Sequence, residues 1–274
     1  MCLYCGEHIG KIWYVQEENH TAAGPLVRLV DRIMYSGIIR PGLQSIKKRQ
    51  PYGTERWTGV TRALWDAITR SLHGFQVLPD LDSALAVVDK ANEVVLSTCA
   101  CREVLSPDQP QAWKCIGLNM AAKVTMNHEA QPWRAISKVE AKEIIAEQRQ
   151  QGCFQSVGWR LGPQVNWLCN CDQHCGAHRA PELEWGLIPS FFVSHLVKPD
   201  SCDSCRECAE WCLRPGALSF ASDGRVRIEE ALCRGCGLCI EHCPTGALGY
   251  APRRVIYDVA AGKKVVLPTE AVRV

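Results

Sequence analysis

The chain has 274 residues, of which 47% are hydrophobic and 22% charged, and its formal net charge is +2 at pH 7. These values are ordinary for a globular protein with one or two cores, and they exclude the broad basic surface of a nucleic-acid-binding protein. No apolar run approaches the roughly 18 residues that a membrane-spanning helix needs, so we expect no membrane span. The 17 cysteines are unusual, and without a secretory signal they predict a reducing, cytoplasmic location.

Residues 1–75 are predicted to form a helical arm. Apolar side chains recur at helical intervals over residues 25–40 and again over 54–72, where His73-Gly74 supplies a stop. The arm carries Trp13, Trp57 and Trp65, which we assign to packing or an interface rather than to cofactor stacking. The arm is therefore the expected docking surface for a larger catalytic subunit.

Residues 76–195 are predicted to form a small mixed α+β domain with cysteines on its loops. Asp80 or Asp82 can cap a first helix, and Ser137 with Glu140 makes a capping box for a second. Short apolar runs predict strands at residues 93–97, 153–159 and 165–168. A small sheet with helices packed against it is the simplest arrangement of these elements.

Eight cysteines near the C-terminus stand in two copies of one spacing. Each copy has three cysteines separated by two residues and then a fourth, and the copies are offset by 31 positions: Cys202, Cys205, Cys208 and Cys212, then Cys233, Cys236, Cys239 and Cys243. The following residues echo one another, since Cys-Leu-Arg-Pro-Gly-Ala-Leu in the first copy matches Cys-Pro-Thr-Gly-Ala-Leu in the second. This end of the chain is therefore a duplicated half-domain.

This pattern resembles the bacterial-type ferredoxins with two [4Fe–4S] clusters. The resemblance implies a ferredoxin-like duplicated βαβ domain over residues 196–274, in which the fourth cysteine of each run binds the other cluster. The implied ligand sets are Cys202, Cys205, Cys208 and Cys243 for one cluster, and Cys212, Cys233, Cys236 and Cys239 for the other. Structural zinc fits this spacing poorly, because zinc sites use two well-separated pairs.

Two further pairs of cysteines have a C-x-C spacing and follow predicted strands. Cys99 and Cys101 come after the strand at 93–97, and Cys169 and Cys171 come after the strand at 165–168. We predict that these four thiolates converge on a further metal centre, an iron–sulfur cluster or a zinc ion.

The other upstream cysteines are harder to assign. Cys115 and Cys175 can replace or add to the C-x-C ligands, and Cys2 with Cys5 can form half of another site. Cys153 is expected to be a small buried hydrophobic residue.

The stretch from Asp82 to Cys175 resembles the region upstream of ferredoxin repeats in poorly characterised iron–sulfur proteins. The resemblance rests on the Cys-Ala-Cys-Arg motif at 99–102, on Cys115 and on the Cys-Asn-Cys motif at 169–171. Such relatives often carry extra cysteines where this chain has Asp172 and His174. Their activity is unassigned.

The leading functional hypothesis is an iron–sulfur electron-transfer protein or subunit that relays single electrons to or from a partner oxidoreductase, a larger redox enzyme or subunit. An alternative is a reductase whose middle cysteine site reduces a substrate while the ferredoxin end supplies electrons. A third, in which clusters support nucleic-acid binding, conflicts with the near-neutral charge. Phosphate-loop, dinucleotide and nucleophile-elbow motifs are absent from the sequence, which predicts no nucleotide or flavin site.

Overall fold

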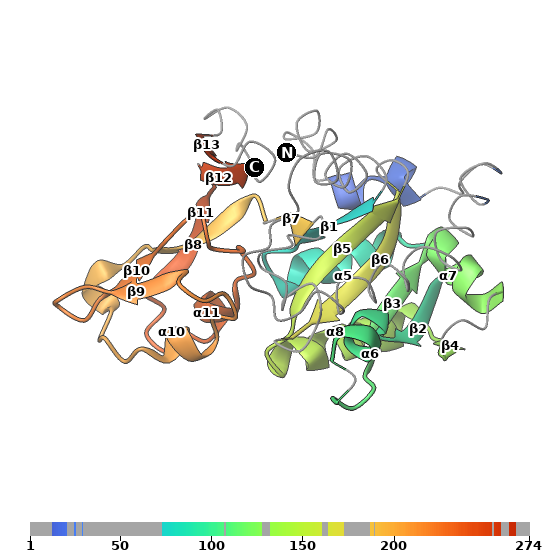
Figure 1. The fold of residues 1–274 in the computed structure, drawn as a ribbon, viewed down its shortest axis with the longest axis horizontal. Coiled ribbons are helices and arrows are strands. Elements are labelled where there is room, and N and C mark those ends of the chain that lie inside the picture. The colour runs from blue at the N-terminus through green and yellow to red at the C-terminus, as the bar shows by residue number, and fades with distance from the viewer. Residues whose placement is uncertain are drawn as a thin grey trace.

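The computed structural model describes residues 13–20, 25, 29, 73–106, 108–127, 132–160, 164–172, 187–188, 190–253, 255–258 and 263–266. Most of the chain described before residue 189 belongs to one sheet with its helices, the sheet unit, and residues 190–266 form a smaller C-terminal unit (Figure 1). Several predictions lie outside the described residues: the helices at 25–40 and 54–72, apart from residues 25 and 29, and the residues Cys2, Cys5, Trp57, Trp65, His174 and Cys175.

The sheet unit is built on seven strands in the order β4-β2-β3-β6-β5-β1-β7, in which all neighbours are antiparallel except β1 and β7. The strands are β1 (His73–Val77), β2 (Val94–Thr98), β3 (Trp113–Leu118), β4 (Trp133–Ala135), β5 (Phe154–Arg160), β6 (Val165–Cys171) and β7 (Leu187–Ile188). The strands predicted at 93–97 and 153–159 are confirmed to within one residue at each end. The strand predicted to end at residue 168 continues to Cys171, because it stays paired with β5.

The N-cap residues expected from the sequence are confirmed, although the Glu140 carboxylate of the predicted capping box binds Arg134. Helix α5 (Leu81–Lys90) begins after Asp80, whose carboxylate accepts from the Ser83 amide at 2.8 Å. Helix α8 (Lys138–Gln150) begins after Ser137, whose hydroxyl accepts from the Glu140 amide at 3.1 Å. Two shorter helices complete the sheet unit, α6 (Ala100–Leu105) and α7 (Asn119–Asn127).

The two faces of the sheet carry different side chains, because alternate residues of a strand point to opposite sides. On one face, Leu96, Ile116 and Leu168 are fully or almost fully buried and pack with residues of α5 and α8 such as Val88 and Ile145. The cysteines of β3 and β6 occupy the alternate positions of these strands. The larger hydrophobic cluster therefore lies on one face, and the thiols lie on the other face in a smaller cluster with Val77, Phe154 and Leu238.

The described part of the predicted N-terminal arm contains two 3-10 helices, η1 (Trp13–Val15) and η2 (Glu17–His20), which pack on the sheet unit. Tyr14 is buried in the core, and the buried His20 ring makes hydrogen-bond contacts with the Tyr14 carbonyl at 2.9 Å and with the Asn119 amide nitrogen at 3.1 Å. His73 and Gly74, expected to end a helix, are the first residues of β1.

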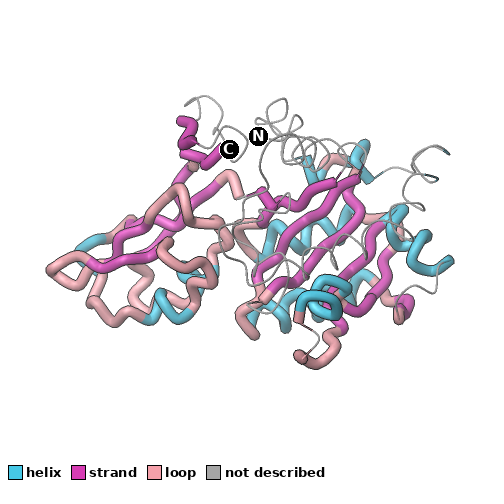
Figure 2. Tube along the Cα trace, in the orientation of Figure 1, coloured by secondary structure: helices cyan, strands magenta, loops and turns pink. Residues whose placement is uncertain are grey.

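The C-terminal unit consists of short strands and four-residue helices joined by long loops (Figure 2). Its strands pair as β8 (Phe192–Leu196) with β11 (Leu248–Pro252), β9 (Leu218–Phe220) with β10 (Val226–Ile228), and β12 (Val255–Asp258) with β13 (Lys263–Val266). Its helices are η4 (Pro199–Ser201), α10 (Glu207–Glu210) and α11 (Leu238–Glu241). The last strand pair is antiparallel and lies near the C-terminus. The partner of β11 is β8, which begins at Phe192. The sequence predicts that this domain starts at residue 196, four residues later.

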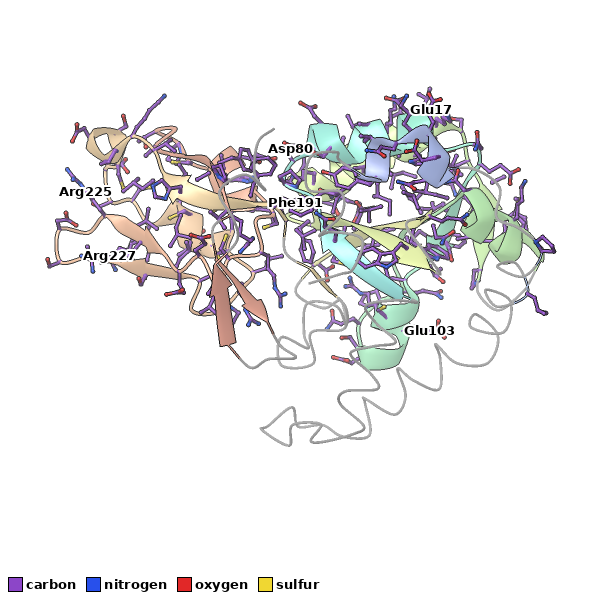
Figure 3. The ribbon with its side chains drawn as sticks, turned by 90° about the horizontal axis from the view of Figure 1, so that it is seen from above. Glu17, Asp80, Glu103, Phe191, Arg225 and Arg227 are labelled. Carbon is purple, nitrogen blue, oxygen red and sulfur yellow. The ribbon has the colours of Figure 1, made fainter. Side chains whose placement is uncertain are left out.

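An ion pair between a buried arginine and a more exposed glutamate joins the two units. The Arg149 side chain at the end of α8 is 3% exposed and donates to both carboxylate oxygens of Glu241, at 2.8 and 2.6 Å. It also donates to the Cys236 carbonyl at 2.7 Å. Figure 3 shows Asp80 and Phe191 at this junction and Arg225 at the far end of the C-terminal unit. Among the described residues, no helix combines the length and apolar character needed to cross a membrane.

Candidate iron–sulfur sites

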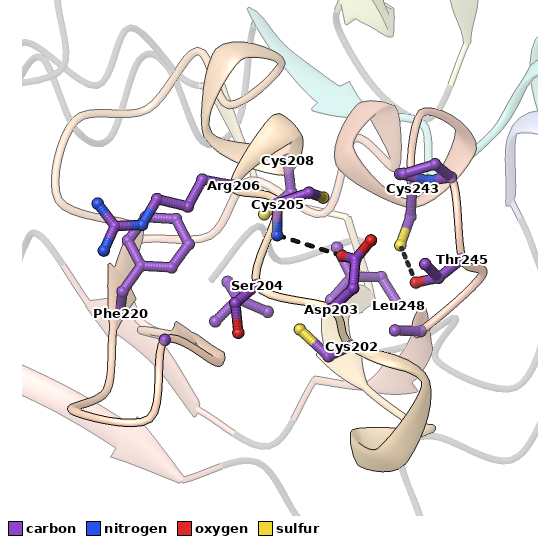
Figure 4. Close-up of a pocket in the computed structure, with 14 residues that line it drawn as sticks. Cys202, Asp203, Ser204, Cys205, Arg206, Cys208, Phe220, Cys243, Thr245 and Leu248 are labelled. Atoms are coloured by element: carbon purple, nitrogen blue, oxygen red, sulfur yellow. Dashed lines mark hydrogen bonds between the residues drawn. The ribbon is translucent and has the colours of Figure 1, made fainter.

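Four cysteines surround a pocket in the C-terminal unit, which we call pocket I (Figure 4). Cys202, Cys205 and Cys208 come from the loop before α10 and from α10 itself, and Cys243 comes from the loop after α11. Cys205 is exposed, and Cys202 and Cys243 are partly exposed. Pocket I is therefore accessible from solvent.

Four other cysteines line a second pocket, pocket II. Cys233, Cys236 and Cys239 come from the loop before α11 and from α11, while Cys212 comes from the loop after α10. Phe154 of the sheet unit and Ser194 of β8 also line it. Each pocket thus takes three cysteines from one copy of the repeat and the fourth from the other copy, which is the grouping that the ferredoxin resemblance implies.

Left-handed backbone turns aim the cysteines of both copies at their pockets. Ser204 and Arg206 have φ values of 63° and 68°, and the equivalent Gly235 and Gly237 have values of 68° and 74°. A Cβ atom at Gly235 would lie 2.0 Å from the Phe192 carbonyl oxygen. The second copy therefore needs glycine, while the first accepts side chains at a strain of about 1 kcal/mol per residue.

The thiols of each pocket influence one another. Burial, and then the nearby thiols, raise the pKa of Cys208 in pocket I and of Cys236 in pocket II to about 11 each. Burial also opposes ionisation of Cys243, but backbone and Thr245 hydrogen bonds outweigh it and lower its pKa. Four crowded thiolates are stable together only when bound cations offset their charge, so both donor sets fit an iron–sulfur cluster.

Polar groups contact the sulfur atoms and the loops that carry them. The Gly235 amide donates to the Cys233 sulfur at 3.3 Å, and the Cys239 sulfur lies 3.1 Å from the Ser194 hydroxyl. Arg253, 1% exposed, donates to the Cys233 carbonyl at 2.8 Å and to the Ser190 carbonyl at 2.7 Å. Sequence reasoning missed Arg149 and Arg253, because nothing near either residue indicates that it clamps a distant cysteine loop.

A third set of thiols lies on the sheet face opposite the hydrophobic core, and we call it the sheet thiol group: Cys99, Cys101, Cys115, Cys169 and Cys171. Cys115 and Cys169 are directly opposite each other on β3 and β6. The structure thus brings together the four cysteines predicted to form a further metal centre and adds Cys115. Cys169 and Cys171 lie within a strand rather than on a loop.

Cys153 is buried at 3% exposure, as predicted, and lies apart from this group, against α8. Its sulfur contacts the Lys114 ammonium at 3.8 Å and the Gln148 side-chain oxygen at 3.5 Å. Within the described residues, no group of three or more His, Cys, Asp or Glu side chains is placed to hold a single metal ion. The thiols of pockets I and II instead surround a hollow, as the ligands of a multi-iron core do.

Comparison with known proteins supports the chemistry of the C-terminal unit. Residues 226–249 match the family model of a 4Fe-4S binding domain. This range contains Cys233, Cys236, Cys239 and Cys243, and the match indicates a [4Fe–4S] cluster in the chain.

A stretch of 52 residues is 40% identical to "Indolepyruvate oxidoreductase subunit IorA" of Methanothermobacter marburgensis. The match covers 19% of this chain and 8% of that protein. No solved structure matches the chain. Both comparisons cover only a small part of the chain, and the match over residues 226–249 supports iron–sulfur chemistry there.

Proposed function

We propose that this protein is an iron–sulfur electron-transfer protein or subunit that relays single electrons through two [4Fe–4S] clusters to or from a partner oxidoreductase. The observation that carries the proposal is the exchange of fourth cysteines, which gives pockets I and II four thiols each. The 4Fe-4S domain match and the resemblance to an oxidoreductase subunit support it.

The two pockets are next to each other, which suits transfer between them. Trp211 precedes Cys212 of pocket II, and His242 precedes Cys243 of pocket I. Their rings stack with centroids 3.4 Å apart and an interplanar angle of 17°. This ring pair lies at equivalent positions of the two copies, so it joins a ligand loop of one pocket to a ligand loop of the other.

Pocket I is the proposed point of exchange with the partner, because its cysteines are the more exposed ones. Pocket II contacts the sheet unit through Phe154, Trp211 and Leu213, which pack together with Cys236. Electrons would enter or leave at pocket I and pass inward to pocket II. The cytoplasmic location and a partner other than nucleic acid stay predictions from the sequence.

Four single variants test both the clusters and the exchange of ligands. In anaerobically purified full-length protein we expect at least about eight irons with matching sulfide, and EPR signals after reduction by dithionite. Cys205→Ser and Cys243→Ser should leave the same remaining EPR spectrum, although the two residues belong to different copies. Cys236→Ser and Cys212→Ser should leave the other spectrum.

Cys153→Ser is the matched control, because this buried thiol lies outside both pockets, and it should retain all of the iron. Protein that carries zinc in place of iron and stays EPR-silent after reduction would contradict the proposal. Pairing of Cys205 with Cys212, rather than with Cys243, would contradict the ligand exchange.

A second candidate function is a reductase that acts at the sheet thiol group. The observation in its favour is that this group packs against Phe154, which also lines pocket II. Oxidation of the dithionite-reduced chain by a substrate, without any partner protein, would support it. Turnover only when a partner is added would support electron relay alone.

A further inference from the structure

The five members of the sheet thiol group come from different parts of the chain. Cys99 directly precedes α6 and Cys101 lies within it, Cys115 lies on β3, and Cys169 and Cys171 lie on β6. Because Cys169 and Cys171 are two residues apart on one strand, their side chains project from the same face. The fold therefore collects these thiols from three separate stretches of sequence.

The thiols interact with one another as well as sharing a face. Cys115 lies directly opposite Cys169 in the β3–β6 register, and both pack with Cys99 in one cluster. Cys101 and Cys171 pack into the same cluster. Each thiol thus has another thiol as a neighbour, which is the arrangement of a shared ligand set.

Ordinary core packing explains this group poorly. Cysteine often fills a core as a small apolar residue, and Cys153 does so against α8. Among the described residues, however, the larger apolar cluster with α5 and α8 contains no cysteine, whereas the smaller cluster on the other face contains all five thiols together with Val77, Phe154 and Leu238. Five thiols that face each other on the remaining face form a concentrated set of soft metal ligands.

The group is also continuous with pocket II. Phe154 lies opposite Cys171 in the β5–β6 register and lines pocket II from the sheet side. Cys236 and Trp211 pack into the same apolar cluster as Cys99 and Cys171. An electron in pocket II therefore has the sheet thiol group as a direct neighbour.

A cluster of charged side chains lies at the end of the strands that carry the thiols. Arg102 follows Cys101, and Lys114 precedes Cys115, with side chains 12% and 3% exposed. Both cations bind the Asp172 carboxylate, which follows Cys171, and the Arg102 contact is 2.6 Å. Lys114 alternates with Cys115 along β3, so its ammonium lies on the opposite face of the sheet, where it contacts the Cys153 sulfur at 3.8 Å. It therefore acts on Cys153 rather than on Cys115.

We propose that the sheet thiol group holds a third iron–sulfur cluster, bound by four thiolates from Cys99, Cys101, Cys115, Cys169 and Cys171. It deepens the proposed function, on which it rests, because this cluster exchanges electrons with the one in pocket II. The three centres then form a linear series from the exposed pocket I, through pocket II, to the sheet.

Iron and sulfide analysis of the full-length chain tests the third cluster. We expect about 12 irons per chain, four in each of three clusters. The double variant Cys169→Ser/Cys171→Ser should lose about four of them, a loss of one third, while Cys153→Ser retains all 12. The EPR signals of pockets I and II should persist in the double variant, which shows that it is folded.

The possible results separate the third cluster from the proposed function. About eight irons in the unmodified chain, unchanged in the double variant, would overturn the third cluster and leave the two-cluster relay standing. About eight irons with one zinc that is lost in the double variant would overturn it in the same way. Absence of iron in pockets I and II would overturn the proposed function itself.

The count on the unmodified chain decides the question even when the double variant does not fold. Single serine variants at the five positions then identify the ligands. Four of them should lower the iron content by about a third, and one should leave it unchanged. Iron content that is unchanged in all five variants would overturn the assignment.

Discussion

Pockets I and II come from the same repeated motif but have different surroundings. Pocket I is lined only by residues of the C-terminal unit, between positions 202 and 248, whereas Phe154 of the sheet unit also lines pocket II. The residues with a left-handed backbone conformation also differ between the two copies. Ser204 and Arg206 stand in the first copy, and Gly235 and Gly237 stand in the second. Duplication thus supplies two equal ligand sets, and contact with the sheet makes them unequal.

This difference has consequences for redox chemistry. Burial disfavours the more negative reduced form of a cluster, while hydrogen bonds to sulfur and nearby cations favour it. Pocket II has both influences, since it lies against the sheet and Arg149 and Arg253 donate to its cysteine loops. Pocket I lies nearer to solvent, with the Arg206 guanidinium 5.0 Å above the Phe220 ring at its rim.

Removal of the metal is expected to have the largest effect, and it should unfold the region around pocket I more than the region around pocket II. Without their clusters the four-residue helices and short strands keep few contacts, so folding depends on metal. Hydrogen exchange of the iron-free protein should show roughly 100-fold faster exchange over residues 202–228. Residues 233–250, held by the sheet unit, should change less. Equal loss of protection in both halves would contradict the distinction.

Glycine replacement should break pocket II alone. A Cβ at Gly237 would lie 2.2 Å from the Pro79 carbonyl oxygen and 2.2 Å from the Tyr250 hydroxyl. Gly237→Ala should therefore lower the free energy of unfolding by about 3 kcal/mol, from overpacking and left-handed strain together.

The matched change in the first copy is Arg206→Gly, which relieves strain and should alter stability by less than about 1 kcal/mol. Thermal unfolding of the two holoproteins, with iron content measured in parallel, compares them. Equal destabilisation by the two changes would show that the second copy does not depend on its contact with the sheet unit.

Loss of the Arg149 side chain should lower both stability and the potential of one cluster. Arg149→Met removes the partner of Glu241 and the donor to the Cys236 carbonyl, at a cost of about 2 kcal/mol because the carbonyl loses its donor. The potential at pocket II should become more negative because a nearby positive charge is lost, while that at pocket I should stay the same. Chemical unfolding and potentiometric EPR titration measure the two effects.

Arg134→Met is the control, because Arg134 forms an ion pair with Glu140 on the surface, where its side chain is 50% exposed. It should cost no more than about 0.5 kcal/mol and shift neither potential. A shift of both potentials in Arg149→Met would show a general change of structure rather than a local charge effect.

The smallest expected effect concerns single hydroxyl groups. Ser194→Ala removes the hydroxyl 3.1 Å from the Cys239 sulfur and should make the potential at pocket II more negative. Thr245→Val removes the weaker contact, at 3.7 Å, to the Cys243 sulfur in pocket I and should shift that potential less. Potentiometric titration of both variants measures these shifts in reduction potential. A larger shift in Thr245→Val than in Ser194→Ala would contradict the expected order.

Local signals in the sequence predicted the features that depend on neighbouring residues. Asp80 and Ser137 cap helices as expected, because a cap needs only the next few amides. The grouping of the eight C-terminal cysteines followed from spacing and from the ferredoxin resemblance. Strand β3 and the continuation of β6 to Cys171 were missed, because they depend on pairing with distant strands.

The sequence by itself determined which residues can bind iron, since two-residue intervals place thiols on one short loop whatever the rest of the chain does. Only the tertiary structure decided which groups from distant parts of the sequence contact these cysteines. Cys115 joins Cys169 through strand register, and Arg149 reaches the Cys236 loop across 87 positions of sequence. Such contacts depend on packing of the whole sheet, and no local pattern encodes them.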